Sequence, residues 1–284
     1  MISALAKSHQ ILVGENEQER VQRAGYLRAA VQAAEFIERE LYDAETGVLF
    51  RSWRTGRGST EGFAEDYAFL IQGLLDLYEA SFDLRWLKWA GQLQDAMDAR
   101  FWDDERGGYF TSQSGDANIV LRLKESYDGA EPAASSVAAV NLLRFGAVFD
   151  HAWNPNEAGE ISYRDRGKAC IAAFQRQWST TPQAMPQMLT ALELALDSPR
   201  HVVLAGETAA ADFQALATVL HEKLGPRRSL LAVTAATDRE WLEARAPWLS
   251  GMKAVESRAT AYVCEEYACQ APVTDPEELR RLLG

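Results

Sequence analysis

The chain has few basic residues for its size. Its 284 residues include 29 Lys and Arg against 41 Asp and Glu, a formal net charge of −12. Proteins that read nucleic acids gather Lys and Arg on one face, so we expect no nucleic-acid partner. The sequence also lacks an apolar run of 18 residues, and residues 1–7 are too short and polar for a signal peptide, so we expect a cytoplasmic protein without a membrane partner.

Cysteine is scarce as well. Cys264 and Cys269 are separated by four residues rather than two, and together with Cys170 they lack the paired spacing of a disulfide framework or a zinc site. Buried free thiols are therefore the expected state. A redox pair of Cys264 and Cys269 is the alternative, because strand geometry can bring two such residues together.

What the chain does have is an internal repeat. The tract LYDAETGVLFRS at residues 41–52 recurs sixty positions later as FWDDERGGYFTS at residues 101–112. A fixed period of this size is typical of stacked supersecondary units, none of which can bury its apolar face alone. The repeat predicts an array of related helical units.

Two kinds of helical pattern alternate along the first 180 residues. Residues 65–78 are apolar nearly all round, interrupted beyond the first turn only by Gln72 and Asp76, and residues 132–149 have the same character. Single apolar stripes mark three further segments, at residues 21–41, 84–101 and 163–178. This alternation predicts two concentric layers, with the apolar helices inside. The expected fold is an α/α toroid of helical hairpins, whose pocket opens where the inner helices begin.

Composition changes after about Ser198. Three strands and one helix are expected beyond that point, at residues 201–206, 229–234, 259–264 and 209–224. We therefore divide the chain into a partial α/α toroid at residues 1–198 and a small α/β appendage at residues 199–284. The glycine after the first strand stands alone, which favours a structural cap over a nucleotide site.

Several tracts together are highly specific, namely GFAEDYA at 62–68, GLLDLYEA at 73–80, DGAEP at 128–132 and ACQAPVTDP at 268–276. In these tracts the chain resembles the C-terminal region of the spermatogenesis-associated protein 20 family, whose bacterial members are thioredoxin-domain-containing proteins. The resemblance covers nearly the whole chain. It implies an N-terminal thioredoxin-like domain followed by a six-hairpin, glycosidase-like α/α toroid.

The thioredoxin-like part is expected to be missing here, because no Cys-x-x-Cys occurs in the chain. A redox role of that domain therefore does not transfer. We count six or seven helices where a closed toroid of this class needs about twelve, so we expect an open ring or a fragment of a longer protein.

Asp66 and Asp128 form the predicted catalytic pair. They lie 62 residues apart, close to one repeat, and each stands at the entrance to an expected inner helix. A helix N-terminus would keep one carboxylate ionised, while apolar surroundings would raise the pKa of the other, as acid/base catalysis on a sugar requires. The alternative is that both are helix caps or first-turn carboxylates. Glu65 and Glu131 have the same ambiguity.

The loops at this rim supply further side chains for substrate binding. The predicted set comprises Arg51, Trp53, Arg54, Glu65, Tyr109, Arg122, Lys124 and Glu131. Aromatic faces stack on sugar rings, and forked guanidinium groups suit carboxylates or phosphates, which favours an acidic saccharide. Equally, the arginines can pair with the abundant acidic residues, and Trp53 can pack beneath a loop.

Histidine is too rare to support other sugar chemistry. The chain has His9, His151, His201 and His221, and none stands at an expected inner-helix entrance, which argues against a histidine-based epimerase. No His, Cys and carboxylate set has metal-ligand spacing, and no nucleophile elbow occurs. We expect neither a metal nor a cofactor.

These patterns favour a carbohydrate-active, glycosidase-like toroid module in which Asp66 and Asp128 act on a saccharide. The rival is a non-catalytic interaction or regulatory module, whose partner is a thioredoxin-like domain or a second protomer. A fragment without independent activity is the third possibility.

Overall fold

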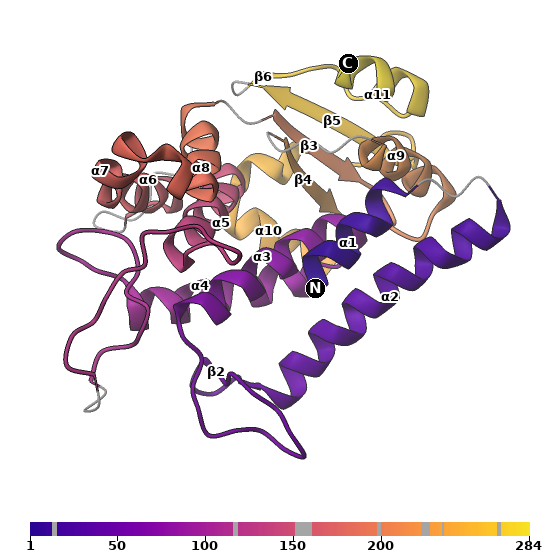
Figure 1. Cartoon of the computed structure of the whole chain (residues 1–284). Helices are drawn as coiled ribbons and strands as arrows, with labels where there is room; N and C mark the ends of the chain where they lie inside the picture. Colours follow the sequence, from indigo (N-terminus) through magenta and orange to yellow (C-terminus); the bar gives the residue numbers. More distant parts are fainter. Residues whose placement is uncertain are drawn as a thin grey trace.

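A computed structural model of the chain describes residues 1–12, 16–115, 119–150, 161–197, 200–222, 228–234, 236–265 and 268–284. Over these residues the protein is mostly helical, with a small mixed sheet near its C-terminus (Figure 1). The expected alternation of helices and the later change to strands are confirmed. His151, Ser198 and the end of the helix expected at residues 209–224 lie outside the described residues.

The helical part consists of α1 (Ile2–Ile11), α2 (Glu17–Glu40), α3 (Ala64–Ser81), α4 (Leu84–Phe101), α5 (Ala134–Phe149), α6 (Tyr163–Ala173), α7 (Gln175–Thr180) and α8 (Pro186–Leu196). Helices α1, α3, α5 and α8 contact one another in that order, and α2, α4 and α6 each pack on the helix before them. A short 3-10 turn, η1 (Pro182–Ala184), precedes α8. The four contacting helices therefore form one layer and their partners a second.

Burial follows the apolar pattern of the sequence. Most side chains of α3 and α5 are buried, whereas α2 buries only Ala30 and Ala34 completely. Gly73 lets α1 approach α3 closely, because a Cβ there would lie 3.3 Å from the Cβ of Ile2. The expected helix at residues 163–178 is interrupted at Phe174, whose buried ring packs against Gly108.

The repeat is visible as two copies of one turn. In the first copy, Asp43 Oδ1 accepts hydrogen bonds from two following backbone amides, and Gly47 N donates to Asp43 O at 2.8 Å. In the second, Asp103 and Gly107 make the same bonds, again at 2.8 Å. Both glycines have φ near +70°, a conformation that strongly favours glycine. The first copy ends in a hairpin of two short strands, β1 (Tyr42–Asp43) and β2 (Val48–Leu49).

The sheet has the strand order β4-β3-β5-β6. Its strands are β3 (Arg200–Ala205), β4 (Arg228–Val233), β5 (Thr260–Glu265) and β6 (Ala268–Cys269), with β3 parallel to β4 and the other neighbours antiparallel. Helices α9 (Ala211–His221) and α11 (Pro276–Leu283) cover one face. The other face joins the core of the helical layer, where α10 (Ala236–Arg245) and the 3-10 turn η2 (Pro247–Gly251) also lie.

The sheet is attached to the C-terminal ends of the inner helices. Tyr78 Oη accepts a hydrogen bond from Ala232 N at 3.1 Å, and Trp248 Nε1 donates to Val148 O at 3.2 Å. One continuous apolar core runs from α1 through α5 to β4. The C-terminal strands therefore close one end of the helical layer.

The cysteine expectation was wrong for two of the three residues. Cys264 and Cys269 form a disulfide between β5 and β6, because the antiparallel register pairs them directly. Cys170 is a buried free thiol, as expected. The pairing of Cys264 with Cys269 was the alternative in the sequence analysis, and strand geometry brings the two residues together as that alternative supposed.

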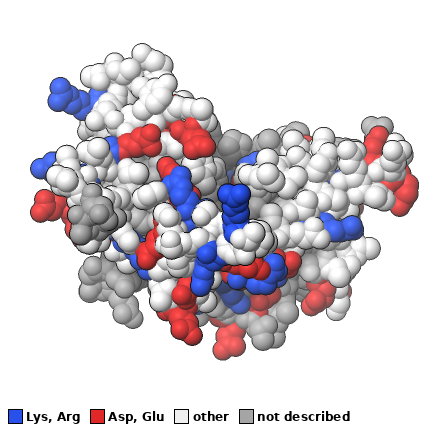
Figure 2. Space-filling model, turned by 60° about the horizontal axis from the view of Figure 1, so that its bottom comes forward, with Lys and Arg blue, Asp and Glu red and all other residues white. Residues whose placement is uncertain are grey.

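Charged side chains of both signs are interspersed on the face drawn in Figure 2. Exposed ion pairs such as Arg85–Glu35, at 2.8 Å, are of the kind that contributes little to stability. Within the described ranges, no helix combines the length and apolar character needed to cross a bilayer. The same residues contain no group of three or more His, Cys, Asp and Glu that could hold a metal ion.

Candidate functional site

The predicted rim lies at the N-terminal ends of α3 and α5. Asp66, in the first turn of α3, accepts a hydrogen bond from Phe63 N at 2.9 Å, which satisfies one of the free amides at the helix start. Burial raises the pKa of Asp66, the Phe63 amide and Arg51 oppose that rise, and the nearby Glu65 and Glu131 add to it. Asp66 is therefore both a capping residue and a carboxyl group with a raised pKa.

Asp128 has a different environment. Its side chain is only 6% exposed, and Oδ1 accepts a hydrogen bond from Ala133 N at 2.9 Å. Its Oδ2 accepts from Gln187 N at 2.9 Å and Met188 N at 3.1 Å, in the first turn of α8. Three backbone donors occupy the two oxygens, so this carboxylate links the start of α5 to the start of α8. That arrangement is the capping role given as the alternative from the sequence.

The rim brings Arg51 together with acidic side chains. Arg51 Nη2 lies 2.7 Å from Glu65 Oε1, and Nη1 lies 3.5 Å from Asp66 Oδ2. The hydrogen bond to Glu65 is the main cause of the raised pKa of Arg51, to which Glu131 also contributes electrostatically. Glu131 is thus the carboxylate just before α5 that helps to raise the pKa of Asp66. Asp128 instead accepts hydrogen bonds from backbone amides.

Tyr109 does not face the rim, although the sequence placed it there as a ligand-binding aromatic. Its side chain is 1% exposed, and its hydroxyl donates to Asp98 Oδ1 at 2.5 Å. Asp98 also pairs with Arg166 and accepts from Gln94 Nε2 at 2.8 Å. Burial raises the pKa of Asp98, against the effect of Arg166. This network joins α4 to α6 inside the protein.

Two other predicted ligand-binding residues hold the loop after α4. Lys124 Nζ lies 2.6 Å from Asp103 Oδ2, and that hydrogen bond lowers the pKa of the Asp103 carboxyl. Arg122 donates to Ser112 O at 2.9 Å and lies over the ring of Phe110 at 4.1 Å. Both cations are engaged by their own loop, Lys124 with an acidic side chain, as the alternative proposed for the arginines, and Arg122 with a backbone carbonyl and an aromatic ring.

The remaining two predicted residues lie at the loop before α3. Trp53 is 45% exposed and meets the ring of Phe36 edge-on at 5.6 Å. Arg54 is exposed, and its backbone amide donates to Gly56 O at 2.9 Å. Trp53 therefore offers part of an aromatic face to solvent.

The structure has a cavity at the other end of the inner helices. It has a volume of about 410 Å³ and lies between α1, α3, α5, α8 and the start of β4. Its wall carries four cationic and three acidic side chains, namely Lys7, Arg144, Arg164, Arg228, Asp76, Glu79 and Asp197. Cavities of this size suit small ligands, so this is the best-formed candidate binding site.

Asp76 is the centre of the charged cluster. It is 1% exposed, and its Oδ1 lies 2.9 Å from Arg144 Nη1 and 3.4 Å from Lys7 Nζ. Arg144 Nη2 lies 3.1 Å from Glu79 Oε1. Burial lowers the pKa of Arg144, but the two carboxylates outweigh it and raise the pKa overall. Arg144 is therefore a fixed cation that holds two acidic side chains of α3.

The C-terminal part supplies the end wall of the cavity. His221 Nε2 lies 3.0 Å from Glu79 O, and the imidazole stacks on Phe82 at 5.8 Å. Burial lowers the pKa of His221 to about 4, so the ring is neutral at pH 7. Arg228 bonds to Leu220 O, which fixes β4 against the end of α9.

Sequence reasoning missed this cavity although it had one signal. Asp76 and Gln72 were noted as polar interruptions of an apolar helix, and Arg144 interrupts α5 in the same way. Polar residues in an enclosed helix need partners, so such interruptions on neighbouring helices predict a buried polar site. No comparable sequence feature indicated that Lys7 of α1, Arg164 of α6 and Arg228 of β4 line the same cavity.

Comparison with known proteins identifies relatives over most of the chain. No protein-family model matches it. Human spermatogenesis-associated protein 20 is 40% identical over 263 residues, which cover 89% of this chain and 32% of the human protein. Over these residues the chain corresponds to a region of the spermatogenesis-associated protein 20-like family. The rat member of that family is 38% identical over the same length, with the same coverage of both chains.

A more distant relative extends the comparison to a nematode. The uncharacterized protein B0495.5 of Caenorhabditis elegans is 32% identical over 267 residues, which cover 91% of this chain and 34% of that protein. The chain thus spans about a third of the length of the curated relatives it matches. The names of these family members assign no reaction to the region they share with this chain.

Proposed function

We propose that the cavity between the inner helices and β4 binds an acidic saccharide, a sugar acid or a sugar phosphate. The observation that carries this proposal is the cavity of about 410 Å³ lined by Lys7, Arg144, Arg164 and Arg228. Guanidinium groups recognise carboxylates and phosphates through paired hydrogen bonds. The whole chain has a net charge of −12, whereas the cavity wall carries more cationic than acidic side chains. This local excess of positive charge favours an anionic ligand.

Uncharged groups in the same wall suit sugar hydroxyls. Gln10, Gln72, Gln187 and Thr190 line the cavity beside Leu75, Val140 and Leu194. Amide and hydroxyl groups can both donate and accept hydrogen bonds, as sugar hydroxyls do. This mixture supports a polar ring with one anionic substituent rather than a free inorganic anion.

The proposal places this site in an α/α toroid of which the chain supplies an arc. The order α1, α3, α5, α8 in one layer and α2, α4, α6 in the other supports that arrangement. Residues 1–198 would form the arc and residues 199–284 a cap on it. The separate apolar cluster beneath α9 and α11 supports the cap as a unit, although its other face shares the core of the arc.

Catalysis is a further part of the proposal and concerns the rim. The raised pKa of Asp66 supports a proton-donor role, which glycoside hydrolysis requires. Asp128 stays in the predicted pair, but its three backbone donors support a capping role. Glu131 is the carboxylate that we propose as partner of Asp66, with Trp53 and Arg51 as binding residues of this second site at the rim, which is separate from the cavity. The non-catalytic interaction module is the alternative if no saccharide binds.

Calorimetry with D-glucuronate, glucose 6-phosphate, glucose and inorganic phosphate tests the binding proposal. We expect heat from the two acidic sugars and at least tenfold weaker binding of glucose and phosphate, because each lacks half of the recognised groups. Equal binding of glucose would contradict the role of the cations. No binding of either acidic sugar at millimolar concentration would reject the saccharide proposal.

A pair of lysine variants locates the site. Lys7→Met removes a cation from the cavity wall, while Lys88→Met removes a similarly exposed lysine that pairs with Asp238 elsewhere. We expect about tenfold weaker binding of the acidic sugar in Lys7→Met and unchanged binding in Lys88→Met. The same loss in both variants would place the ligand elsewhere.

A further inference from the structure

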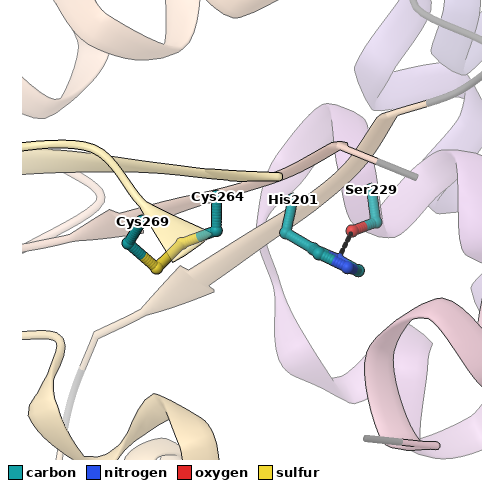
Figure 3. The surroundings of a disulfide bond; sticks show 4 residues. All are labelled: His201, Ser229, Cys264 and Cys269. Atoms are coloured by element: carbon teal, nitrogen blue, oxygen red, sulfur yellow. Dashed lines mark hydrogen bonds between the residues drawn. A yellow bond between two sulfur atoms is a disulfide. The ribbon is translucent and has the colours of Figure 1, made fainter. Parts of the chain in front are cut away.

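Four side chains form a row straight across the sheet. Strand pairing aligns Ser229 with His201, His201 with Cys264, and Cys264 with Cys269. Directly paired residues project from the same face, and this is the face that joins the helical core. Figure 3 shows the disulfide beside His201, whose imidazole points along the row to Ser229. His201 Nδ1 and Ser229 Oγ are 2.8 Å apart.

The two sulfur atoms of the disulfide have unequal access. Cys269 is exposed and lies on β6, the outer strand of the sheet as described. Cys264 is 3% exposed and lies inside the row, next to the strand that carries His201. A nucleophile from solvent can therefore reach Cys269, and Cys264 is the leaving group.

We propose that Cys264–Cys269 is a thiol–disulfide exchange site that takes two electrons from an external dithiol. One thiolate of that dithiol attacks Cys269 Sγ, the Cys264–Cys269 bond breaks, and Cys264 leaves as a thiolate that takes up a proton. The second thiol of the dithiol loses its proton and attacks the first sulfur of the same dithiol, which is bonded to Cys269 in the mixed disulfide. This step releases Cys269 as a thiolate, which then takes up a proton. The dithiol is oxidised to a disulfide, and both cysteines end as thiols.

The disulfide is poorly placed for a purely structural role. It closes a loop with a sequence separation of only five, and in the chain-entropy model short loops gain the least stability from a disulfide. The hairpin also has backbone support, since Gln270 N donates to Val263 O at 2.9 Å and Val273 pairs with Ala261. The fold can therefore keep its register when the bond is open.

His201 separates the disulfide from the cavity. The residue is 8% exposed, neighbours Cys264 across β3 and β5, and its ring lies 5.5 Å from the ring of Trp248. On its other side are Ser229 of β4 and then the cavity with Arg164, Arg228 and Asp197. In Figure 3 the imidazole points to Ser229 and away from the disulfide, so we assign the exchange to the two cysteines alone.

Reduction of the folded chain by dithiothreitol is the first test. After treatment with about 1 mM reagent at pH 7, alkylation of the folded chain should add an alkyl group at the exposed Cys269, and alkylation in urea should then label all three cysteines, whereas the untreated chain should gain only the label on Cys170 in urea. Cys170 is the internal control, because burial raises its pKa to about 12 and it should react only in urea. A folded chain that resists dithiothreitol, or that never reforms the disulfide with glutathione disulfide, would overturn the proposal.

Single-cysteine variants test which sulfur is attacked. In Cys264→Ser, glutathione disulfide should form a mixed disulfide with Cys269 at least tenfold faster than with Cys264 in Cys269→Ser, because only Cys269 is exposed. Equal rates would contradict the proposed order of attack. Circular dichroism of both variants verifies that the chain is folded.

Discussion

Acidic side chains have different partners at the two ends of the inner helices. At the N-terminal ends, Asp66 and Asp128 accept hydrogen bonds from backbone amides. In the C-terminal halves, Asp76 and Glu79 are held by the side chain of Arg144. The first turn of a helix has free N–H groups, and its later turns have none. A carboxylate in the later turns therefore needs a cation from another helix.

This difference separates capping from ligand binding. Three backbone amides donate to the two oxygens of Asp128, so this carboxylate is already used to hold the helix starts. Side-chain cations that converge around a cavity can instead be shared with an anionic ligand. We therefore expect the largest losses of stability from substitutions in the charged cluster around Asp76, and the smallest from substitutions at the rim.

Arg144→Met should have the largest effect on stability. It leaves two carboxylates of α3 without their main cation, and Asp76 is almost fully buried, so we expect a loss of about 4 kcal/mol in urea unfolding. Replacing Asp76 by Leu and Glu79 by Gln in the same chain should restore much of that loss. Arg85→Met, which breaks an exposed pair, should cost less than about 1 kcal/mol. Equal losses in the two single variants would refute the distinction between the cluster and the surface.

Asp128→Ala should have the next largest effect on stability. It leaves three backbone amides at the starts of α5 and α8 without their acceptor, which we expect to cost about 3 kcal/mol. Asp104→Ala, at an exposed position, should cost less than about 0.5 kcal/mol. Stability that stays unchanged in Asp128→Ala, with loss of a sugar-dependent activity, would favour the catalytic role over the capping role.

His221 should make the C-terminal attachment sensitive to acid. Burial lowers its pKa in the folded chain to about 4, against about 6.5 when unfolded, so the unfolded state binds a proton first as pH falls. Its contribution is complete above pH 6.5 and is lost on acidification toward pH 4, with about 2 kcal/mol lost between pH 7 and pH 5. His221→Gln should lack this component in urea unfolding at the two pH values. An identical pH dependence in both proteins would show that His221 is not the sensitive group.

Asp66→Ala should have the smallest effect of the four. It removes the acceptor for one amide at the start of α3, which costs about 1 kcal/mol in comparable caps. Asp66→Asn keeps an acceptor oxygen and should cost less than half of that. If binding of glucuronate or glucose 6-phosphate is unchanged in Asp66→Asn and Asp128→Asn, the rim pair has no part in recognition of the sugar.

Much of the fold could be predicted from particular residues. The paired Asp-Gly turns at Asp43 and Asp103 revealed the repeat, and the apolar character of residues 65–78 and 132–149 predicted which helices are enclosed. The short helix α1 was missed, since its ten residues carry no distinctive pattern, and α8 was missed between the expected helices at residues 163–178 and 209–224.

The site was harder to predict because burial depends on partners from distant segments. Tyr109 has the composition of a ligand-binding aromatic, but the acceptor Asp98 turns its hydroxyl inward. Asp76 was noticed only as an interruption of an apolar helix, and its partners Lys7 and Arg144 lie 69 and 68 positions away in the sequence. Local patterns cannot reveal such pairs, which arise only when the helices are packed.

The cavity wall begins at Lys7 of the first helix and ends at Leu230 of β4, so it takes residues that are more than 200 positions apart in the chain. During synthesis, the helices can assemble as they leave the ribosome, but the chamber has no end wall until the first two strands of the sheet have followed. A molecule that occupies it would therefore bind only chains in which the sheet has docked. Such a molecule would act as a check on completed assembly and would slow the separation of the strands from the helices.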